Sequence, residues 1–338
     1  MKKIIFLLVL LIITSFIYSQ NDIKEMFEKS WNTNDTFEKK QIREKIIDLS
    51  PDSEYGLFCK AWIFSVNDDN NTAIEYYTKS IKKNENFWQS YYNRGISYHK
   101  LEMFYEAVYD YFKVIELQPN FAEVYFNRGV SFYYLKKYDD AISDINKAIE
   151  LNYKRAEIYY YKAYILTQKG KYTDAIFNYN LAIELKADYL EAYYNRGWAF
   201  ISTESYKLAI SDFNKVIELN NNNEEAYYSR GYVFYILKEY YKAIIDNNKA
   251  IELNSNYFEA YHLRGKAYFK LKEYKIAISN YSIAIEINPK YSYAYVDRGY
   301  AYIELGNKNE GCKDFNKAIE LGNFLFILLP EEYNKYCK

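Results

Sequence analysis

The chain of 338 residues carries 44 Lys and Arg against 45 Asp and Glu, which gives a formal net charge of −1 at pH 7. Because the two signs are interspersed, no basic stripe is available for a phosphate backbone, and nucleic acid is excluded as an expected partner. Three cysteines are too few for a disulfide-stapled scaffold, and four prolines without a Gly/Ser-rich stretch exclude a flexible linker between domains.

Residues 1–19 are typical of an export signal. Two lysines precede residues 4–13, an apolar run well short of the roughly 20 residues that span a bilayer. Ser19 is small but Ile17 is not, so the cleavage site is poor, and an uncleaved N-terminal anchor remains an alternative. We expect an exported protein in the periplasm or cell envelope, or a secreted one, with membrane contact only through an uncleaved N-terminal segment.

A Gly or Ala recurs every 34 residues through most of the chain. The members of this series are Ala61, Gly95, Gly129, Ala163, Gly197, Gly231, Gly265 and Gly299. A fixed period of this length predicts a stacked array of helical hairpins. Such an array offers a long surface to a partner, since each unit contacts only its neighbours.

Each period contains two apolar stripes, which the unit around Gly197 illustrates. Tyr193 and Phe200 lie on one face of a first helix together with Gly197, which predicts helix A. A second stripe predicts helix B, and its residues are Ala209, Phe213 and Val216. The turn between the helices is short and polar, so the two helices form an antiparallel hairpin.

This order of aromatic, small and Ala positions resembles the tetratricopeptide repeat family. The resemblance covers residues 54–325, about eight units. It implies an all-α fold, a right-handed superhelical solenoid of antiparallel helix pairs. Residues 20–53 are expected to form one further, degenerate helical hairpin and residues 326–338 a C-terminal capping helix, because terminal units of a solenoid are usually atypical.

A basic residue stands immediately before each small residue from Gly95 on. Five repeats combine an Arg there with an Asp sixteen residues later, as in Arg196 and Asp212, whereas Lys162 occurs with Asn178. Because a buried cation needs a partner, we expect an ion pair between helices A and B of one repeat. A pair with a neighbouring repeat and a row of arginines that binds anions are the alternatives.

The resemblance places the binding surface in a concave groove lined by helices A. Aromatic residues recur on this face three residues before and one residue after the small residue, which suits extended peptides. Asparagines two residues before it resemble a ladder that holds a peptide main chain. The candidate groove residues are Tyr92, Asn93, Phe126, Asn127, Tyr160, Tyr164, Tyr194, Asn195, Trp198, Tyr228 and Tyr232. The ladder is interrupted at Tyr161, Ser229, Leu263 and Asp297.

These features predict a non-catalytic adaptor that binds an extended peptide or a partner protein in this groove. The alternative is a glycan-binding or cell-wall-binding module that stacks sugar rings on the same aromatic side chains. A purely architectural spacer is a third hypothesis, because the 43 tyrosines of the chain also occupy core positions.

Sequence motifs for catalysis, metal binding and cofactor binding are missing. Gly306 and Gly311 have the spacing of a phosphate-binding loop but lack the Lys and Ser or Thr that must follow. His99 and His262 are the only histidines and lie nearly five repeats apart. We therefore expect no catalytic residue, no cofactor and no metal.

Two of the three cysteines are predicted to lie close together. Cys312 falls on helix B of the last repeat, and Cys337 ends the capping helix that should pack beside it. Two interpretations stay open: the pair fills a core as small apolar residues, or it forms a disulfide that an oxidising compartment permits. Cys59 lies in the first helix A.

Overall fold

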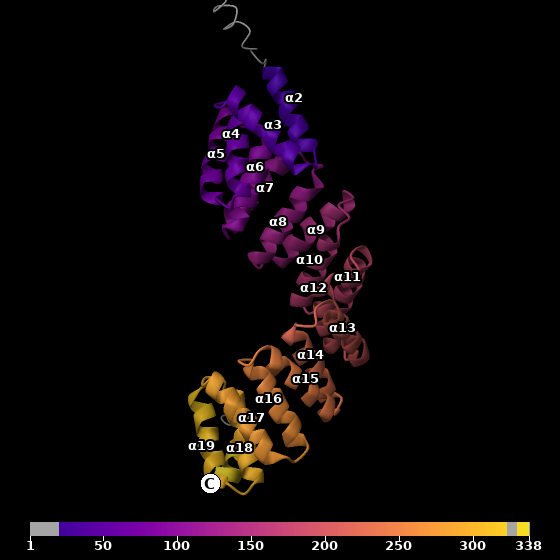
Figure 1. Cartoon of the computed structure of the whole chain (residues 1–338), viewed down its shortest axis with the longest axis vertical. Coiled ribbons are helices and arrows are strands. Elements are labelled where there is room, and N and C mark those ends of the chain that lie inside the picture. The colour runs from indigo at the N-terminus through magenta and orange to yellow at the C-terminus, as the bar shows by residue number, and fades with distance from the viewer. Residues whose placement is uncertain (1–19, 323–329, 338) are drawn as a thin grey trace, which may run out of the picture. The chain divides into compact units, whose positions relative to one another are not determined.

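The computed structural model describes residues 20–322 and 330–337, which form helices joined by turns (Figure 1). The helices are α2 (Gln20–Asn32), α3 (Thr36–Leu49), α4 (Glu54–Val66), α5 (Asn70–Lys83), α6 (Trp88–Lys100), α7 (Phe104–Leu117), α8 (Ala122–Tyr134), α9 (Tyr138–Glu150), α10 (Ala156–Gln168), α11 (Tyr172–Leu185), α12 (Leu190–Ser202), α13 (Tyr206–Leu219), α14 (Glu224–Ile236), α15 (Tyr240–Leu253), α16 (Phe258–Lys270), α17 (Tyr274–Ile287), α18 (Ser292–Glu304), α19 (Lys308–Glu320) and α21 (Pro330–Cys337).

Consecutive helices pair as antiparallel hairpins, for example α12 with α13 and α14 with α15. From α4 to α19 we call the first helix of each pair helix A and the second helix B. This arrangement confirms the all-α fold of antiparallel helix pairs. The chain divides into two compact units, residues 1–154 with α2 to α9 and residues 155–338 with α10 to α21, and each is described by itself.

Within each unit the hairpins stack in chain order. Helix B of one repeat packs against helix A of the next, as α13 does against α14 and α15 against α16. Helices A also contact one another directly, as α6 does with α8 and α16 with α18. One continuous surface of a unit is therefore formed by successive helices A.

A residue with positive φ lies in the turn after helix A, at the same register in every repeat. These residues are Asp68, Glu102, Lys136, Gly170, Glu204, Lys238, Lys272 and Gly306. The turn is closed by backbone hydrogen bonds, such as the 2.8 Å bond from the Glu239 amide to the Phe234 carbonyl. Only glycine adopts this left-handed conformation without strain, so most of these turns keep a strained residue at this point.

The small residue of helix A allows the aromatic residue of helix B to approach closely. A Cβ atom added at Gly197 would lie 2.8 Å from the ring of Phe213, and one added at Gly265 would lie 2.6 Å from the ring of Tyr281. Both rings are almost fully buried. The 34-residue period of small residues is thus a requirement of core packing.

The hairpin of α2 and α3 joins the first repeat through aromatic side chains. The ring of Phe27 in α2 lies 5.0 Å from that of Phe58 in α4 and 5.1 Å from that of Phe87. Arg43 in α3 is 2% exposed, and its guanidinium lies 4.3 Å over the ring of Trp62. These contacts bury one face of the hairpin against the first repeat.

The predicted ion pairs between helices A and B of one repeat are confirmed. Arg196 donates from Nε and Nη2 to the two carboxylate oxygens of Asp212, at 2.8 and 2.6 Å. The equivalent pairs are Arg94 with Asp110, Arg128 with Asp144, Arg230 with Asp246 and Arg298 with Asp314. In the repeat where Asn280 replaces the aspartate, Arg264 donates to the side-chain oxygen of that asparagine at 2.6 Å.

The same arginines also reach helix B of the preceding repeat. Arg196 Nη1 donates to Asn180 Oδ1 at 2.6 Å, and Arg230 Nη1 donates to Asn214 Oδ1 at the same distance. Where this partner position is an aromatic residue, the guanidinium of Arg128 lies 4.1 Å over the ring of Phe112. The ion pair therefore stays within one repeat, and the same guanidinium adds an uncharged contact to the preceding repeat, because it has donors for two partners.

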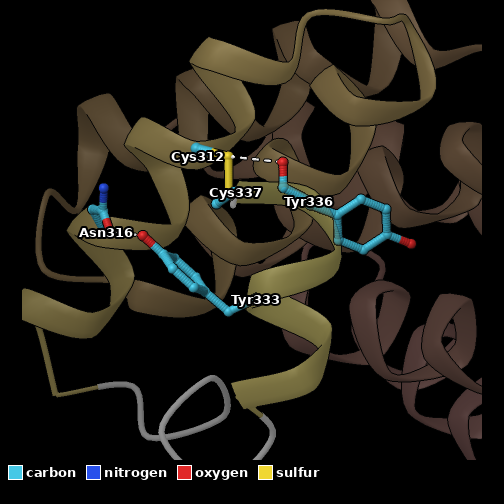
Figure 2. The surroundings of a disulfide bond; sticks show 5 residues. All are labelled: Cys312, Asn316, Tyr333, Tyr336 and Cys337. Carbon is cyan, nitrogen blue, oxygen red and sulfur yellow. Dashed lines mark hydrogen bonds between the residues drawn. A yellow bond between two sulfur atoms is a disulfide. The ribbon is translucent and has the colours of Figure 1, made fainter.

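Helix α21 packs against α19 at the end of the second unit. Cys312 and Cys337 form a disulfide, with their Cα atoms 5.6 Å apart (Figure 2). The Tyr333 hydroxyl donates to Asn316 Oδ1 at 2.8 Å, and Cys312 Sγ lies 3.5 Å from the Tyr336 carbonyl oxygen. The disulfide interpretation is therefore the one that the structure supports.

Two predicted segments lie wholly or partly outside the described residues. The export signal or anchor at 1–19 falls outside them, and of the predicted cap at 326–338 only residues 330–337 are described. Across the described part of the chain, no helix combines the length and the apolar character that crossing a bilayer requires.

Candidate functional site

The predicted groove residues lie on the surface formed by helices A. Ten of the eleven are half-buried, and Tyr92 is buried with 6% of its surface exposed. Their aromatic rings and amide groups contact neighbouring repeats as well as solvent. The surface therefore holds the repeats together and leaves part of these side chains exposed.

Hydrogen bonds connect successive helices A across this surface. Asn127 Nδ2 donates to the Tyr92 hydroxyl at 2.9 Å, and Asn195 Nδ2 donates to the Tyr160 hydroxyl at 3.1 Å. In each case a tyrosine of one helix A accepts from an asparagine of the next. Asn93 donates to the Gln89 carbonyl of its own helix at 2.9 Å, and the residue of the preceding helix A that is equivalent to these tyrosines is Phe58, which has no hydroxyl.

The hydroxyls of Tyr160 and Tyr228 on this surface stay neutral. Burial is the largest cause that raises the pKa of Tyr228 to about 12, and Glu259 adds to it. Burial likewise raises the pKa of Tyr160. These phenols are therefore hydrogen-bonding groups and ring faces at physiological pH, and they are not anions.

The aromatic rings pack in pairs along the surface. The ring of Tyr164 stacks at 6.1 Å from that of Tyr160 in the same helix. Between repeats, the ring of Trp198 lies 5.8 Å from that of Tyr232. Two further candidates contact rings that sequence did not assign to the groove: Phe126 with Tyr153 at 5.6 Å and Tyr228 with Tyr257 at 5.2 Å.

Tyr193 lies on the apolar stripe predicted for helix A and Tyr194 is a predicted groove residue, and in the structure both take part in packing. Both side chains are half-buried. The ring of Tyr194 lies 5.9 Å from that of buried Phe213, and its hydroxyl accepts from Ser229 at 3.3 Å, whereas the ring of Tyr193 lies against the guanidinium of Arg196. Tyr194 contributes to the core because helix A packs between its own helix B and the next helix A.

A pocket of about 350 Å³ opens on the helix A surface of the second unit, and we call it the helix A pocket. It lies between α14, α16, α17 and α18. Its lining residues are Tyr235, Lys266, Phe269, Lys270, Tyr281, Asp297 and Tyr300. The volume is large enough for one or two amino-acid side chains, and it lies in the usual range of ligand sites.

One side of the helix A pocket is organised by a buried histidine. His262 Nε2 lies 2.7 Å from Asp297 Oδ2, and its Nδ1 lies 3.1 Å from the Tyr291 hydroxyl. Because a carboxylate only accepts, the proton of the first bond belongs to Nε2. His262 is 8% exposed, so these bonds fix the position of Asp297 on the pocket wall.

The aromatic walls of the pocket are neutral. Burial first and then the Asp297 charge raise the pKa of Tyr235 to about 12 and shift the pKa of Tyr281 upward as well. The charged groups of the lining are Lys266, Lys270 and Asp297. Charge in the pocket is therefore confined to these three side chains.

Sequence analysis did not assign this pocket. Its signal is a set of interruptions in the repeated pattern. His262 stands where the six preceding repeats carry Tyr or Phe, Lys266 where Trp198 and Tyr232 stand, and Asp297 in the asparagine position. Three departures in two successive repeats meet at one place because helices α16 and α18 are neighbours.

Metal binding has no support among the residues that the structure describes. No group of three or more His, Cys, Asp or Glu side chains there could hold a metal ion.

Cys59 is buried, and burial raises the pKa of its thiol to about 12, so it is a poor nucleophile.

Comparison with protein families gives matches over most of the repeat region. Models described as tetratricopeptide repeat match residues 88–121, 122–152, 258–291 and 292–321. A model described as TPR repeat matches residues 163–203, 197–238 and 231–272. Together these matches cover more than half of the chain. Comparison with curated protein sequences gives no match.

Solved structures of repeat proteins share the fold. The C-terminal part of a TPR repeat-containing protein from Cytophaga hutchinsonii is 23% identical with a TM-score of 0.61, over 73% of this chain and 99% of that chain. A tetratricopeptide repeat protein from Parabacteroides merdae is 19% identical with a TM-score of 0.51, over 84% of this chain and 98% of that one. Cut9, from the Cut9-Hcn1 complex of the APC/C, is 16% identical with a TM-score of 0.55, over 95% of this chain and 64% of that one.

The periodic small residues, the stacked helical hairpins and the family matches agree with one another. Proteins built from these repeats are generally scaffolds that bind peptides or other proteins. The chain belongs to the tetratricopeptide repeat family.

Proposed function

We propose that this protein is a non-catalytic adaptor that binds an extended peptide segment of a partner protein along the helix A surface of its second unit. The observation that carries the proposal is the helix A pocket, which opens on that surface. Half-buried rings such as those of Trp198 and Tyr232 lie on the same surface toward the N-terminal side of the unit. Rigid rings of this kind lose little entropy when a ligand covers them.

Binding of cell-wall glycans is the competing function, since sugar rings also stack on aromatic side chains. The two functions are separated by titrating the protein with a peptide panel and with cell-wall oligosaccharides. We expect Trp198→Ala to lower peptide affinity at least tenfold, as loss of a central aromatic anchor does. The matched control is Tyr241→Ala on helix B, whose side chain is 72% exposed and lies away from this surface.

Two results would contradict the peptide function. In the first, oligosaccharides bind and peptides do not. In the second, Trp198→Ala and Tyr241→Ala change peptide affinity equally, which would place the ligand elsewhere. Circular dichroism of both variants verifies that the helices are retained.

We also propose that the protein is exported and works in the cell envelope or outside the cell. The apolar run at residues 4–13 supports this, and the disulfide between Cys312 and Cys337 is of the kind that persists in oxidising compartments. Mass spectrometry of the native protein tests the proposal. An N-terminus near Gln20 or Asn21 is expected, and a soluble cytoplasmic protein that keeps Met1 would contradict it.

A further inference from the structure

We propose that the helix A pocket binds an acidic side chain of the partner peptide together with an adjoining apolar side chain. This inference rests on the proposed adaptor function and specifies the chemistry of the segment that is recognised. The inference follows from the two lysines of the pocket, from the hydrogen bond that Asp297 already accepts, and from the aromatic walls.

Two lysines supply the positive charge. Lys266 and Lys270 are four residues apart in α16 and therefore lie on the same face of that helix. The Lys266 ammonium lies 5.3 Å from the centre of the Tyr235 ring, so an aromatic wall holds it in the pocket. In the described part of the chain neither lysine forms an ion pair, whereas Lys215 and Lys249 on helices B each pair with a glutamate at 2.6 Å.

The one carboxylate of the pocket does not neutralise these lysines. Asp297 Oδ2 accepts a hydrogen bond from His262 at 2.7 Å, which directs part of its negative charge toward the protein interior. The lining therefore holds two lysines and a single, already hydrogen-bonded carboxylate. A ligand with a carboxylate side chain gains more from Lys266 and Lys270 than it loses to Asp297.

The walls require an apolar group beside the acid. Rings of Tyr235, Phe269 and Tyr300 contribute to the lining, and their faces suit an aromatic or aliphatic side chain. A volume of about 350 Å³ admits such a side chain next to a carboxylate. An acidic sugar fits less well, because its hydroxyl groups would face rings that cannot satisfy them.

The test uses the full mature chain and a fluorescent peptide of sequence Gly-Asp-Phe-Glu-Leu-Gly, acetylated and amidated so that it has no terminal carboxylate. A second peptide replaces the acids with Asn and Gln, and a third replaces them with Lys. We expect the acidic peptide to bind about tenfold more tightly than its amide analogue, because an ion pair with Lys266 beside the Tyr235 ring is worth more than a fully exposed one. Raising the salt concentration reduces the difference.

Variants of the pocket carry opposite expectations. The double variant Lys266→Met with Lys270→Met is expected to abolish the preference for the acidic peptide, because it removes the attractive charges. Asp297→Asn is expected to strengthen binding of the acidic peptide about threefold, because it removes a repulsive charge. The control changes Lys215 and Lys249 to Met, which removes equal charge from helices B. That control leaves the preference intact.

Each contrary result has its own meaning. If peptides of the panel bind but the acidic, amide and basic versions bind equally, the inference is wrong and the adaptor function stands. The inference is also wrong if the Lys215 and Lys249 control acts like the pocket variant, since net charge alone would then explain binding. If no peptide binds, the adaptor function itself is wrong. A uronic acid oligosaccharide is the competing ligand: if it displaces the acidic peptide from the wild type and does not bind the Lys266→Met, Lys270→Met variant, the pocket is a glycan site.

Discussion

The Tyr333 hydroxyl donates to Asn316 Oδ1 at 2.8 Å, at the position where an arginine of a following repeat would otherwise bind. Asn180 and Asn214 hold the same place in earlier repeats and accept from Arg196 and Arg230. After the last repeat, the short helix α21 supplies a phenol at this place (Figure 2). The hydroxyl of Tyr333 thus donates to the Asn316 side-chain oxygen, as an arginine does in earlier repeats.

Opening the disulfide should loosen the end of the second unit. Reduction, or Cys312→Ser with Cys337→Ser, is expected to cost up to about 3 kcal/mol, because a closed loop of this size restricts the unfolded chain. Hydrogen exchange measures the effect as faster exchange in α19 and α21, while α12 and α13 keep their protection because contacts in a repeat array are local. Uniform loss of protection along the unit would contradict this.

Relief of turn strain should stabilise the protein. Lys238 has a φ of 62° in the turn between α14 and α15, so Lys238→Gly is expected to raise the free energy of unfolding by about 1 kcal/mol. Gly306, which has a φ of 80° at the same register, supplies the reverse experiment, and Gly306→Lys should destabilise by a similar amount. Urea denaturation gives both values, and equal effects of the same sign would refute the explanation.

The ion pair of Arg196 with Asp212 should be strongly coupled. The two side chains are 16% and 5% exposed, so removing one leaves a buried charge without its partner. Arg196→Met alone is expected to cost about 3 kcal/mol, and the double variant with Asp212→Leu should cost less than the sum of the single changes. A double-mutant cycle on denaturation free energies decides this, and additive effects would show that the pair is not coupled.

Acid should weaken the first unit through His99. Burial lowers the pKa of His99, whose Nδ1 lies 2.9 Å from the Ser131 hydroxyl. The unfolded chain therefore binds the proton more readily, and this contribution to stability is complete above about pH 6.5 and is lost as pH falls toward the folded pKa. Melting temperatures of the wild type and His99→Gln between pH 5 and 8 measure it, and parallel curves for the two proteins would exclude the role of His99.

The repeated part of the fold could be predicted from sequence because it is set by contacts at fixed offsets. Gly197 and Phe213 meet because one hairpin brings residues sixteen apart together, and Arg196 meets Asp212 for the same reason. The hydrogen bond from Arg196 to Asn180 of the preceding repeat was not predicted. Spacing within one hairpin does not show which residue of the preceding repeat lies beside the guanidinium.

The helix A pocket could not be predicted in the same way. It depends on how α14, α16 and α18 are placed side by side, and this placement is a property of the stack and not of any one repeat. The hydrogen bond between Asn195 and Tyr160 has the same origin. Sequence did identify Asp297 as an interruption of the asparagine ladder, but not His262 as the residue that holds it.

The two-sided use of each arginine makes the array tolerant of whole-repeat changes in length. If the 34 residues of α14 and α15 with their turns were deleted, Arg264 would meet Asn214, the residue that now accepts from Arg230. An insertion of one complete repeat would likewise bring its own guanidinium, carboxylate and amide into register. Gain or loss of a different number of residues would leave these groups opposite the wrong neighbours. Duplication or deletion of a whole repeat therefore keeps the arginine contacts in register on both sides of the junction.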